Sequence, residues 1–328
     1  MAKKLRILSI DGGGIRGIIP ALVMAEIEKQ TGKPIAQLFD LVAGTSTGGV
    51  LALGVTCPHP DDPTRPRYSA ADGVRLYEQE GRRIFSRSPW KRVTSLNGIT
   101  DEKYPSGPVE AVLKEYFGET RLKHALTDVL ITAYETERRF PWFFRSNRAR
   151  QNPEYDFLMW QVARSTSAAP TYFEPTKIDV PSPADYYALI DGGVFANNPT
   201  LCAFVEAKTL QPETEDILVV SIGTGELTRP LKYTEAVNWG AAEWVLPIIN
   251  VLMQGVSATV DYQMHTLLPP TARGKQRYYR FQAKLNEGMD DMDDASRTNL
   301  RVLKLLGEEL IHQSGDQIGK LCRELVKE

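Results

Sequence analysis

The sequence predicts an α/β domain in which a mostly parallel β-sheet lies between two layers of helices. Short apolar runs alternate with stretches of helical periodicity through the first 225 residues, and glycine-rich or polar turns bound them. Continuous apolar runs are typical of parallel strands, because helices cover both faces of such a sheet. Hydrophobic residues make up 42% and charged residues 24% of the chain, which fits a folded globular protein.

The expected elements follow one another along the chain. Strands are expected at 5–10, 39–43, 129–134, around 143–145, 187–190 and 217–222, with helices at 18–30, 48–55, 109–116, 155–164 and 199–210. Beyond residue 225 we expect a helix over 239–268 that Pro247 interrupts, a strand over 277–283 and a helix over 293–314. The proline-rich stretches 58–66 and 181–183 read as loops. We expect one domain over 1–328, with a core over about 5–225 and a helical completion over about 226–328.

Charge and cysteine usage narrow the class of protein. Lysine and arginine (39) nearly balance aspartate and glutamate (41), whereas a nucleic-acid-binding domain would carry a basic excess. The three cysteines lie far apart and form no CxxC pair, which disfavours structural disulfides and fits a reducing compartment. No apolar run reaches the length of a transmembrane helix or of a signal-peptide core. We therefore expect a cytoplasmic protein that does not bind nucleic acid.

The segment Gly44-Thr45-Ser46-Thr47-Gly48 matches the pattern G-x-S-x-G between a predicted strand and a predicted helix. A serine on a strained strand-to-helix turn needs neighbours without a Cβ atom, because the backbone must bend tightly to expose the hydroxyl. The helix that follows would direct its N-terminal N–H groups and positive dipole end at the serine. The motif alone also fits a packing turn, but its flanking elements favour Ser46 as a nucleophile, with Gly44 and Gly48 supporting the turn.

A second glycine-rich loop, Asp11-Gly12-Gly13-Gly14-Ile15-Arg16-Gly17, follows the first predicted strand. It satisfies G-x-G-x-x-G, but a dinucleotide-binding fold needs an acidic residue at the end of the second strand, where the serine turn lies. A P-loop is disfavoured because no Gly-Lys-Ser/Thr follows. Two hypotheses remain. The loop is either a tight turn only, or an oxyanion hole in which the N–H groups of Gly12–Gly14 stabilise a tetrahedral intermediate and Arg16 holds the loop or adds positive field.

No histidine occupies the late strand-end loop that a Ser-His-Asp triad requires. The four histidines lie in a proline-rich insertion or within or beside predicted helices: His59, His124, His265 and His312. Such a loop holds Asp191-Gly192-Gly193 instead, directly after an apolar run. A lone carboxylate there can take the serine proton if it lies within hydrogen-bonding distance. Asp-Gly is also a common turn, so a purely structural role stays open.

These three motifs, taken together and in this order, resemble those of the patatin-like phospholipases, which are lipid acyl hydrolases with a Ser-Asp dyad. The stretches 167–173 (SAAPTYF), 197–199 (NNP) and 221–225 (SIGTG) are also similar to that family. The C-terminal part, from Trp239 through 261–262, 278–282 and 292–295, is similar to the plant patatins and their bacterial relatives. The resemblance covers nearly the whole chain and is weakest over 57–102.

The resemblance implies a three-layer α/β/α fold of the patatin type, with Ser46 as nucleophile, Asp191 as base and Gly12, Gly13 and Gly14 as the oxyanion loop. The supporting motif residues are Asp11, Arg16, Gly17, Gly44, Gly48, Gly192 and Gly193. The implied reaction is of the phospholipase A or lysophospholipase type and proceeds through an acyl-enzyme. No cofactor or metal is expected, because the acidic run 290–294 lacks the calcium-loop pattern and no metal-ligand spacing is present.

Other functions stay open at this point. Some bacterial patatin-like proteins are phospholipases that cyclic-nucleotide signals activate during antiphage defence, which would add a nucleotide activator and an assembled, oligomeric state. A soluble carboxylesterase, or a non-catalytic storage or binding protein, would use the same fold. The expected partners are a phospholipid or acyl ester and, transiently, a membrane surface that Trp239, Trp244 or residues 88–92 would contact. We expect residues 251–264 to belong to the core rather than to an acyl channel.

Overall fold

An eight-stranded sheet forms the centre of the protein, with strand order β11-β9-β1-β2-β5-β8-β7 and with β6 paired to β5. The computed structural model describes residues 4–85, 104–180, 186–285 and 291–327. The strands are β1 (Leu5–Ile10), β2 (Leu41–Thr45), β5 (Asp128–Glu135), β6 (Phe140–Arg145), β7 (Thr176–Asp179), β8 (Tyr186–Asp191), β9 (Ile217–Ile222) and β11 (Tyr278–Phe281). Pairing is parallel from β11 through β9, β1 and β2 to β5, and antiparallel for β6, β7 and β8. The predicted mostly parallel sheet is therefore confirmed.

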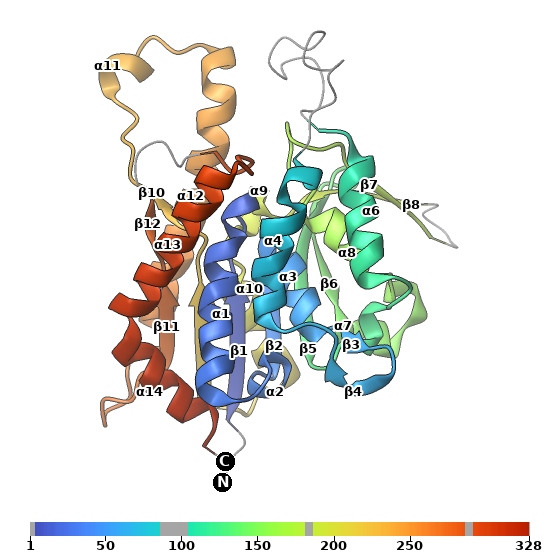
Figure 1. Cartoon of the computed structure of the whole chain (residues 1–328), viewed down its shortest axis with the longest axis vertical. Helices are drawn as coiled ribbons and strands as arrows, with labels where there is room; N and C mark the ends of the chain where they lie inside the picture. Colours follow the sequence, from blue (N-terminus) through green and yellow to red (C-terminus); the bar gives the residue numbers. More distant parts are fainter. Residues whose placement is uncertain (1–3, 86–103, 181–185, 286–290, 328) are drawn as a thin grey trace.

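Helices cover both faces of this sheet. They are α1 (Ile18–Thr31), α2 (Ile35–Leu38), α3 (Thr47–Thr56), α4 (Ala70–Ile84), α6 (Ser106–Phe117), α7 (Ser146–Gln151), α8 (Met159–Thr166), α9 (Gly193–Ala196), α10 (Thr200–Leu210), α11 (Tyr233–Ala236), α12 (Ala241–Leu267), α13 (Arg297–Gln313) and α14 (Gly315–Leu325). In Figure 1, α1, α4, α6 and α13 lie in front of the sheet, and α11 with the start of α12 projects beyond its upper end. A short 3-10 helix, Gly14–Gly17, connects β1 to α1.

The apolar side chains of the strands divide between two clusters, one on each face. In β1, Leu8 and Ile10 belong to the larger cluster, which includes residues of α1, α3 and α13, whereas Leu5 and Ile7 belong to a smaller cluster with α10 and α12. Successive strand residues point to opposite faces, so a strand that is apolar throughout needs a cover on both sides. The three-layer arrangement follows from this pattern.

The prediction that Pro247 interrupts a helix is wrong, because α12 continues through it. A proline removes one backbone hydrogen bond and crowds the carbonyl four residues earlier, which here belongs to Glu243. Glu243 is exposed, so water can bind that carbonyl and limit the cost. The second strand begins at Leu41 rather than at residue 39, so Asp40 lies just before it. The Asp40 carboxylate accepts a hydrogen bond from the Arg6 N–H at 2.9 Å.

Other elements were not predicted. The loop expected at 58–66 contains the short hairpin β3 (Pro58–His59) and β4 (Asp62–Pro66). Helix α4 follows it, and its N-terminus carries a capping box between Ser69 and Asp72 that was visible in the sequence. Helix α14 continues the C-terminal part after Ser314, and both α13 and α14 contribute side chains to the larger core cluster. The loop at 181–183 lies outside the described residues.

The turn after β2 packs against the end of β1 without room for side chains. A Cβ atom at Gly48 would lie 2.3 Å from the carbonyl oxygen of Ile10, and one at Gly44 would lie 2.2 Å from the carbonyl oxygen of Gly48. Both neighbours are backbone atoms, which move only if the strand or the helix moves. Glycine at these two positions therefore allows α3 to begin directly beside the carboxyl end of β1.

We expect Gly48→Ala to lower the free energy of unfolding by at least about 2 kcal/mol, because the added methyl collides with backbone. Gly54→Ala is the matched control in the same helix. A Cβ atom at Gly54 meets nothing within 4 Å, so alanine should be neutral or stabilise by up to about 1 kcal/mol. Urea denaturation of the two variants and the wild type measures both effects; equal stability of the two variants would contradict the steric argument.

Candidate active site

Ser46 occupies the turn between β2 and α3 in a strained conformation. Its φ of 54° and ψ of −126° are rare for a residue with a side chain. The surroundings hold this conformation: the Ser46 N–H donates to Oγ1 of buried Thr166 at 2.8 Å, and Thr45 Oγ1 donates to the Ala196 carbonyl at 2.6 Å. Such strain is typical of functional turns, because the rest of the fold must stabilise it.

The register of β5 explains how Ser46 and Asp191 come together. Thr45, the last residue of β2, pairs with Thr132 of β5, and Asp191, the last residue of β8, pairs with the next residue, Ala133. Because β6 occupies the opposite edge of β5, β2 and β8 share one edge of that strand and meet end to end. The sheet therefore places the serine turn beside the carboxylate, although the two are far apart in the sequence.

The Asp191 side chain is buried and only partly hydrogen-bonded. Its Oδ1 accepts a hydrogen bond from the Gly193 N–H at 2.7 Å, and its Oδ2 has no hydrogen-bond partner within the described residues. Burial raises the pKa of Asp191 to about 7, against the lowering effects of the neighbouring Ser46 hydroxyl and of the Gly193 N–H. A pKa in this range suits a group that exchanges a proton near neutral pH.

The glycine-rich loop lies directly beside the serine. A Cβ atom on Gly12 would be 3.1 Å from the Ser46 Cβ atom, so the loop backbone approaches the reacting group closely. The Gly12 N–H donates to the Asn197 carbonyl at 3.0 Å and is occupied. The N–H groups of Gly13 and Gly14, in contrast, have no acceptor in the described part of the chain. Of the three amides expected to form an oxyanion hole, these two are available.

A buried ion pair between Asp11 and Arg280 anchors the glycine-rich loop. The Asp11 carboxylate accepts hydrogen bonds from Arg280 at 2.9 and 2.6 Å and from Ser257 Oγ at 2.8 Å. Burial by itself lowers the pKa of Arg280, but the Asp11 charge outweighs this and raises the pKa above its usual value. Thr224 Oγ1 holds the other side of the loop by donating to the Gly12 carbonyl at 2.6 Å. The loop is thus fixed before any ligand binds.

The remaining motif residues support the same backbone. Buried Arg16 donates from Nε to the Gly13 carbonyl at 3.2 Å. A Cβ atom at Gly17 would lie 2.4 Å from Thr47 Oγ1, and one at Gly192 would lie 2.1 Å from Thr132 Oγ1. Glycine is therefore needed at both positions because the neighbouring side chains leave no room for a Cβ atom.

A mostly apolar cleft opens over Ser46 and Asp191. It contains about 790 Å³ of space unfilled by protein atoms, its open mouth included. Its apolar walls come mainly from α3, α4 and α6 and from residues 169–173, and include Val50, Leu76, Ile84, Phe85, Val112 and Phe173. None of the four histidines, all of which the structure describes, lines the cleft. Within the described residues, no cluster of three or more His, Cys, Asp or Glu side chains could hold a metal ion.

A family profile described as "Patatin-like phospholipase" matches residues 8–204, which include both glycine motifs and Asp191. The chain belongs to the patatin-like phospholipase family. It is 33% identical to Patatin-like protein 4 of Arabidopsis thaliana, over 93% of this chain and 82% of that protein. It is also 33% identical to Patatin group M-2 of Solanum tuberosum, over 95% of this chain and 84% of that protein. These similarities confirm the predicted family and its class, the serine ester hydrolases.

One further relative shows why the site itself matters. The chain is 32% identical to a Solanum tuberosum protein named "Probable inactive patatin-3-Kuras 1", over 96% of this chain and 88% of that protein. The chain is therefore about as similar to a relative whose name calls it inactive as it is to the other patatins. The chemistry has to be argued from the side chains around Ser46.

Sequence reasoning missed three side chains that position this patatin-like site: Thr166, Thr224 and Arg280. Arg280 lies in a stretch that resembles the family, but nothing in the local sequence connects it to Asp11. The expectation that residues 251–264 form core is correct only in part. Val256, Val260 and Met264 pack in the smaller cluster, Met253 lines the cleft, and Val251 and Leu252 are exposed.

The buried carboxyl group should make stability depend on pH. Because the pKa of Asp191 rises from about 3.8 to about 7 on folding, the folded state binds the extra proton, and stability falls as pH rises between these values. We expect Asp191→Asn to gain stability relative to the wild type over this interval, by up to about 1.4 kcal/mol per pH unit, with a constant difference above it.

Urea denaturation from pH 4 to pH 9 measures this difference. Asp61→Asn is the matched control, since the Asp61 side chain is 89% exposed. A stability difference between Asp191→Asn and the wild type that does not change with pH would show that Asp191 is ionised throughout.

Proposed function

We propose that the protein is a lipid acyl hydrolase of the phospholipase A or lysophospholipase type, with Ser46 as nucleophile and Asp191 as its base. The observation that carries the proposal is the buried Asp191 carboxyl group, whose Oδ2 has no hydrogen-bond partner in the described residues beside the strained serine. A buried carboxylate with one oxygen unpaired is costly to a fold, so its retention at this position favours a catalytic role.

The proposed reaction uses the side chains as the fold presents them. Asp191 takes the proton from the Ser46 hydroxyl while Oγ attacks the ester carbonyl. The N–H groups of Gly13 and Gly14 stabilise the oxyanion, and the N-terminus of α3 adds positive potential. Asp191 returns the proton to the leaving alcohol. It then activates a water molecule, which releases the fatty acid from Ser46 and restores the enzyme.

The cleft supports an acyl chain as the substrate group. Its walls are mainly apolar, and burying each methylene of a chain contributes roughly 0.8 kcal/mol. A short-ester hydrolase or a peptidase would need little of this apolar length. The glycerol and head-group end of a phospholipid would remain at the mouth of the cleft.

Contact with a membrane surface is part of the proposal. No described helix is long and apolar enough to cross a bilayer. The projecting segment of α11 and α12 exposes Tyr233, Val237 and Leu252, and the rings of Trp239 and Trp244 lie 5.0 Å apart in the same segment (Figure 1). Because Met253 of α12 lines the cleft, this apolar segment borders its opening. Residues 88–92, the other stretch expected to touch a bilayer, lie outside the described residues.

Release of fatty acid from mixed phospholipid vesicles tests the proposal. We expect Ser46→Ala to lower the rate at least 10³-fold and Asp191→Asn by a similar factor, because each variant removes one residue of the proposed Ser46–Asp191 dyad. Ser9→Ala is a matched control, at a buried serine that does not line the cleft. Release that persists in Ser46→Ala would overturn the assignment.

Each protein is assayed with and without cyclic dinucleotides, and dependence of the rate on one of them would support the nucleotide-activated phospholipase effector.

The pH dependence of the rate gives a second test. Because Asp191 must be ionised to accept the serine proton, kcat/KM should rise with pH and level off above an inflection near pH 7. A short soluble ester avoids changes in the vesicles. An inflection near pH 4 would show that the pKa of the carboxyl group is not raised, and a rate that is independent of pH would contradict its role as the base.

A further inference from the structure

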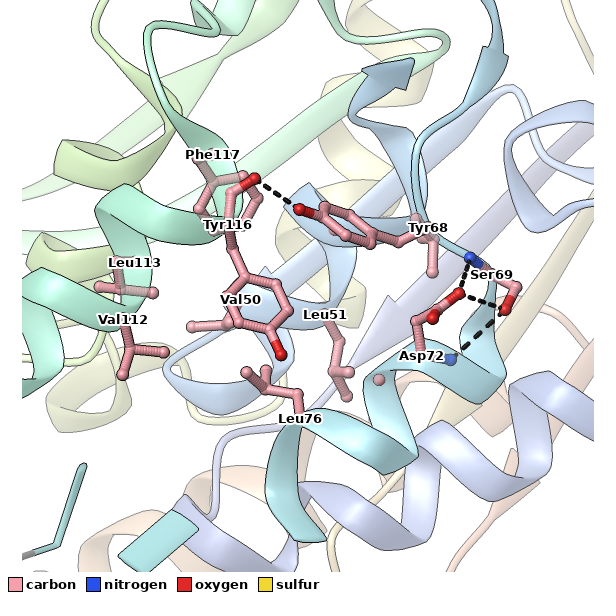
Figure 2. A pocket seen from close by; sticks show the side chains of 13 residues that line it. Val50, Leu51, Tyr68, Ser69, Asp72, Leu76, Val112, Leu113, Tyr116 and Phe117 are labelled. Carbon is pink, nitrogen blue, oxygen red and sulfur yellow. Dashed lines mark hydrogen bonds between the residues drawn. The ribbon is translucent and has the colours of Figure 1, made fainter. Parts of the chain in front are cut away.

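A second apolar chamber lies beside the cleft, between α3, α4 and α6. About 430 Å³ of space there is unfilled by protein atoms, its opening to solvent included. Figure 2 shows the side chains that surround it, and the apolar ones include Val50, Leu51, Leu76, Val112, Leu113 and Phe117. The proposed mechanism makes no use of this space.

The chamber and the cleft share a wall. Val50, Leu76, Val112 and Leu113 line both, so the two spaces adjoin at these side chains. Helix α3 runs past both of them from its start beside Ser46. Gly54, which lines the chamber, lies eight residues after Ser46 and thus about 12 Å further along the helix axis. An acyl chain attached to Ser46 and following α3 would therefore lead toward the chamber.

Two of the polar side chains around the chamber, Tyr68 and Asp72, already have partners. The Tyr68 hydroxyl donates to the Tyr116 carbonyl at 2.7 Å, and the Asp72 carboxylate accepts hydrogen bonds from the Ser69 N–H and hydroxyl at 2.9 and 2.7 Å (Figure 2). The rest of the lining is mainly apolar, and such walls suit a hydrocarbon better than a charged group.

We propose that this chamber receives the methyl end of a long acyl chain and so sets the longest chain that the enzyme hydrolyses efficiently. The inference rests on the proposed function, since it requires an acyl ester at Ser46. A long chain would displace the shared side chains and bury its last methylenes against α6. A short chain would end in the cleft and gain nothing from the chamber.

Gly54 is the residue that keeps the chamber open. It follows Val50 by four residues and Leu51 by three, so all three lie on one face of α3. A Cβ atom at Gly54 would meet nothing within 4 Å. A side chain at this position would therefore begin in open space at the wall of the chamber.

The test is the chain-length profile of Gly54→Leu. Hydrolysis of butyryl, octanoyl, dodecanoyl and palmitoyl esters of one alcohol is measured for the wild type and the variant. We expect the ratio of palmitoyl to butyryl activity to fall at least about tenfold in Gly54→Leu, since the last methylenes lose their site. Gly54→Ala should shift the ratio in the same direction by less. It also serves as the test if the leucine variant does not fold.

Gly315→Leu is the matched control, because a Cβ atom at Gly315, at the start of α14, also meets nothing within 4 Å. Its profile should match that of the wild type. Profiles of both Gly54 variants that match the wild type would overturn the role of the chamber while leaving the hydrolase proposal intact. A wild type that hydrolyses none of the esters, in the presence or absence of cyclic dinucleotides, would overturn both.

Discussion

The rest of the site depends on one close approach of backbones, at which the turn after β2 packs against the carboxyl end of β1. The contacts that exclude a side chain at Gly44 and Gly48 fix where α3 begins and hold Ser46 in its strained conformation. They also bring the loop after β1 beside the serine, where the Gly13 and Gly14 amides are free of acceptors within the described residues. The Ser46 side chain and the two amides are thus positioned by the same packing.

The carboxylate is positioned by a different constraint, the shared edge of β5. Because β2 and β8 end at consecutive residues of that strand, Asp191 lies beside Ser46 and below the apolar cleft. Burial there destabilises the ionised form and raises the pKa of the carboxyl group, which is unfavourable for the fold but useful for proton transfer near neutral pH. The large apolar clusters on both faces of the sheet compensate for this cost.

The surroundings of the site differ on its two sides. Toward α3, α4 and α6 the walls are apolar, both in the cleft and in the chamber behind it. On another side of the glycine loop lie the Asp11–Arg280 ion pair and its hydrogen-bonded serines, which hold the loop in place. The site thus combines an apolar side with a charged, hydrogen-bonded one.

The sequence by itself determined the alternation of strands and helices, the serine turn, the glycine loop and the Asp-Gly-Gly segment, because each depends on short-range patterns of apolar residues and glycines. It missed α4 and α14, and it misjudged Pro247, since tertiary packing and solvent exposure decide these cases. Only the tertiary structure brought Asp191 to Ser46, paired Arg280 with Asp11 and revealed the chamber at Gly54. Those relations depend on strand order and register, which link residues distant in the chain and leave no local signal.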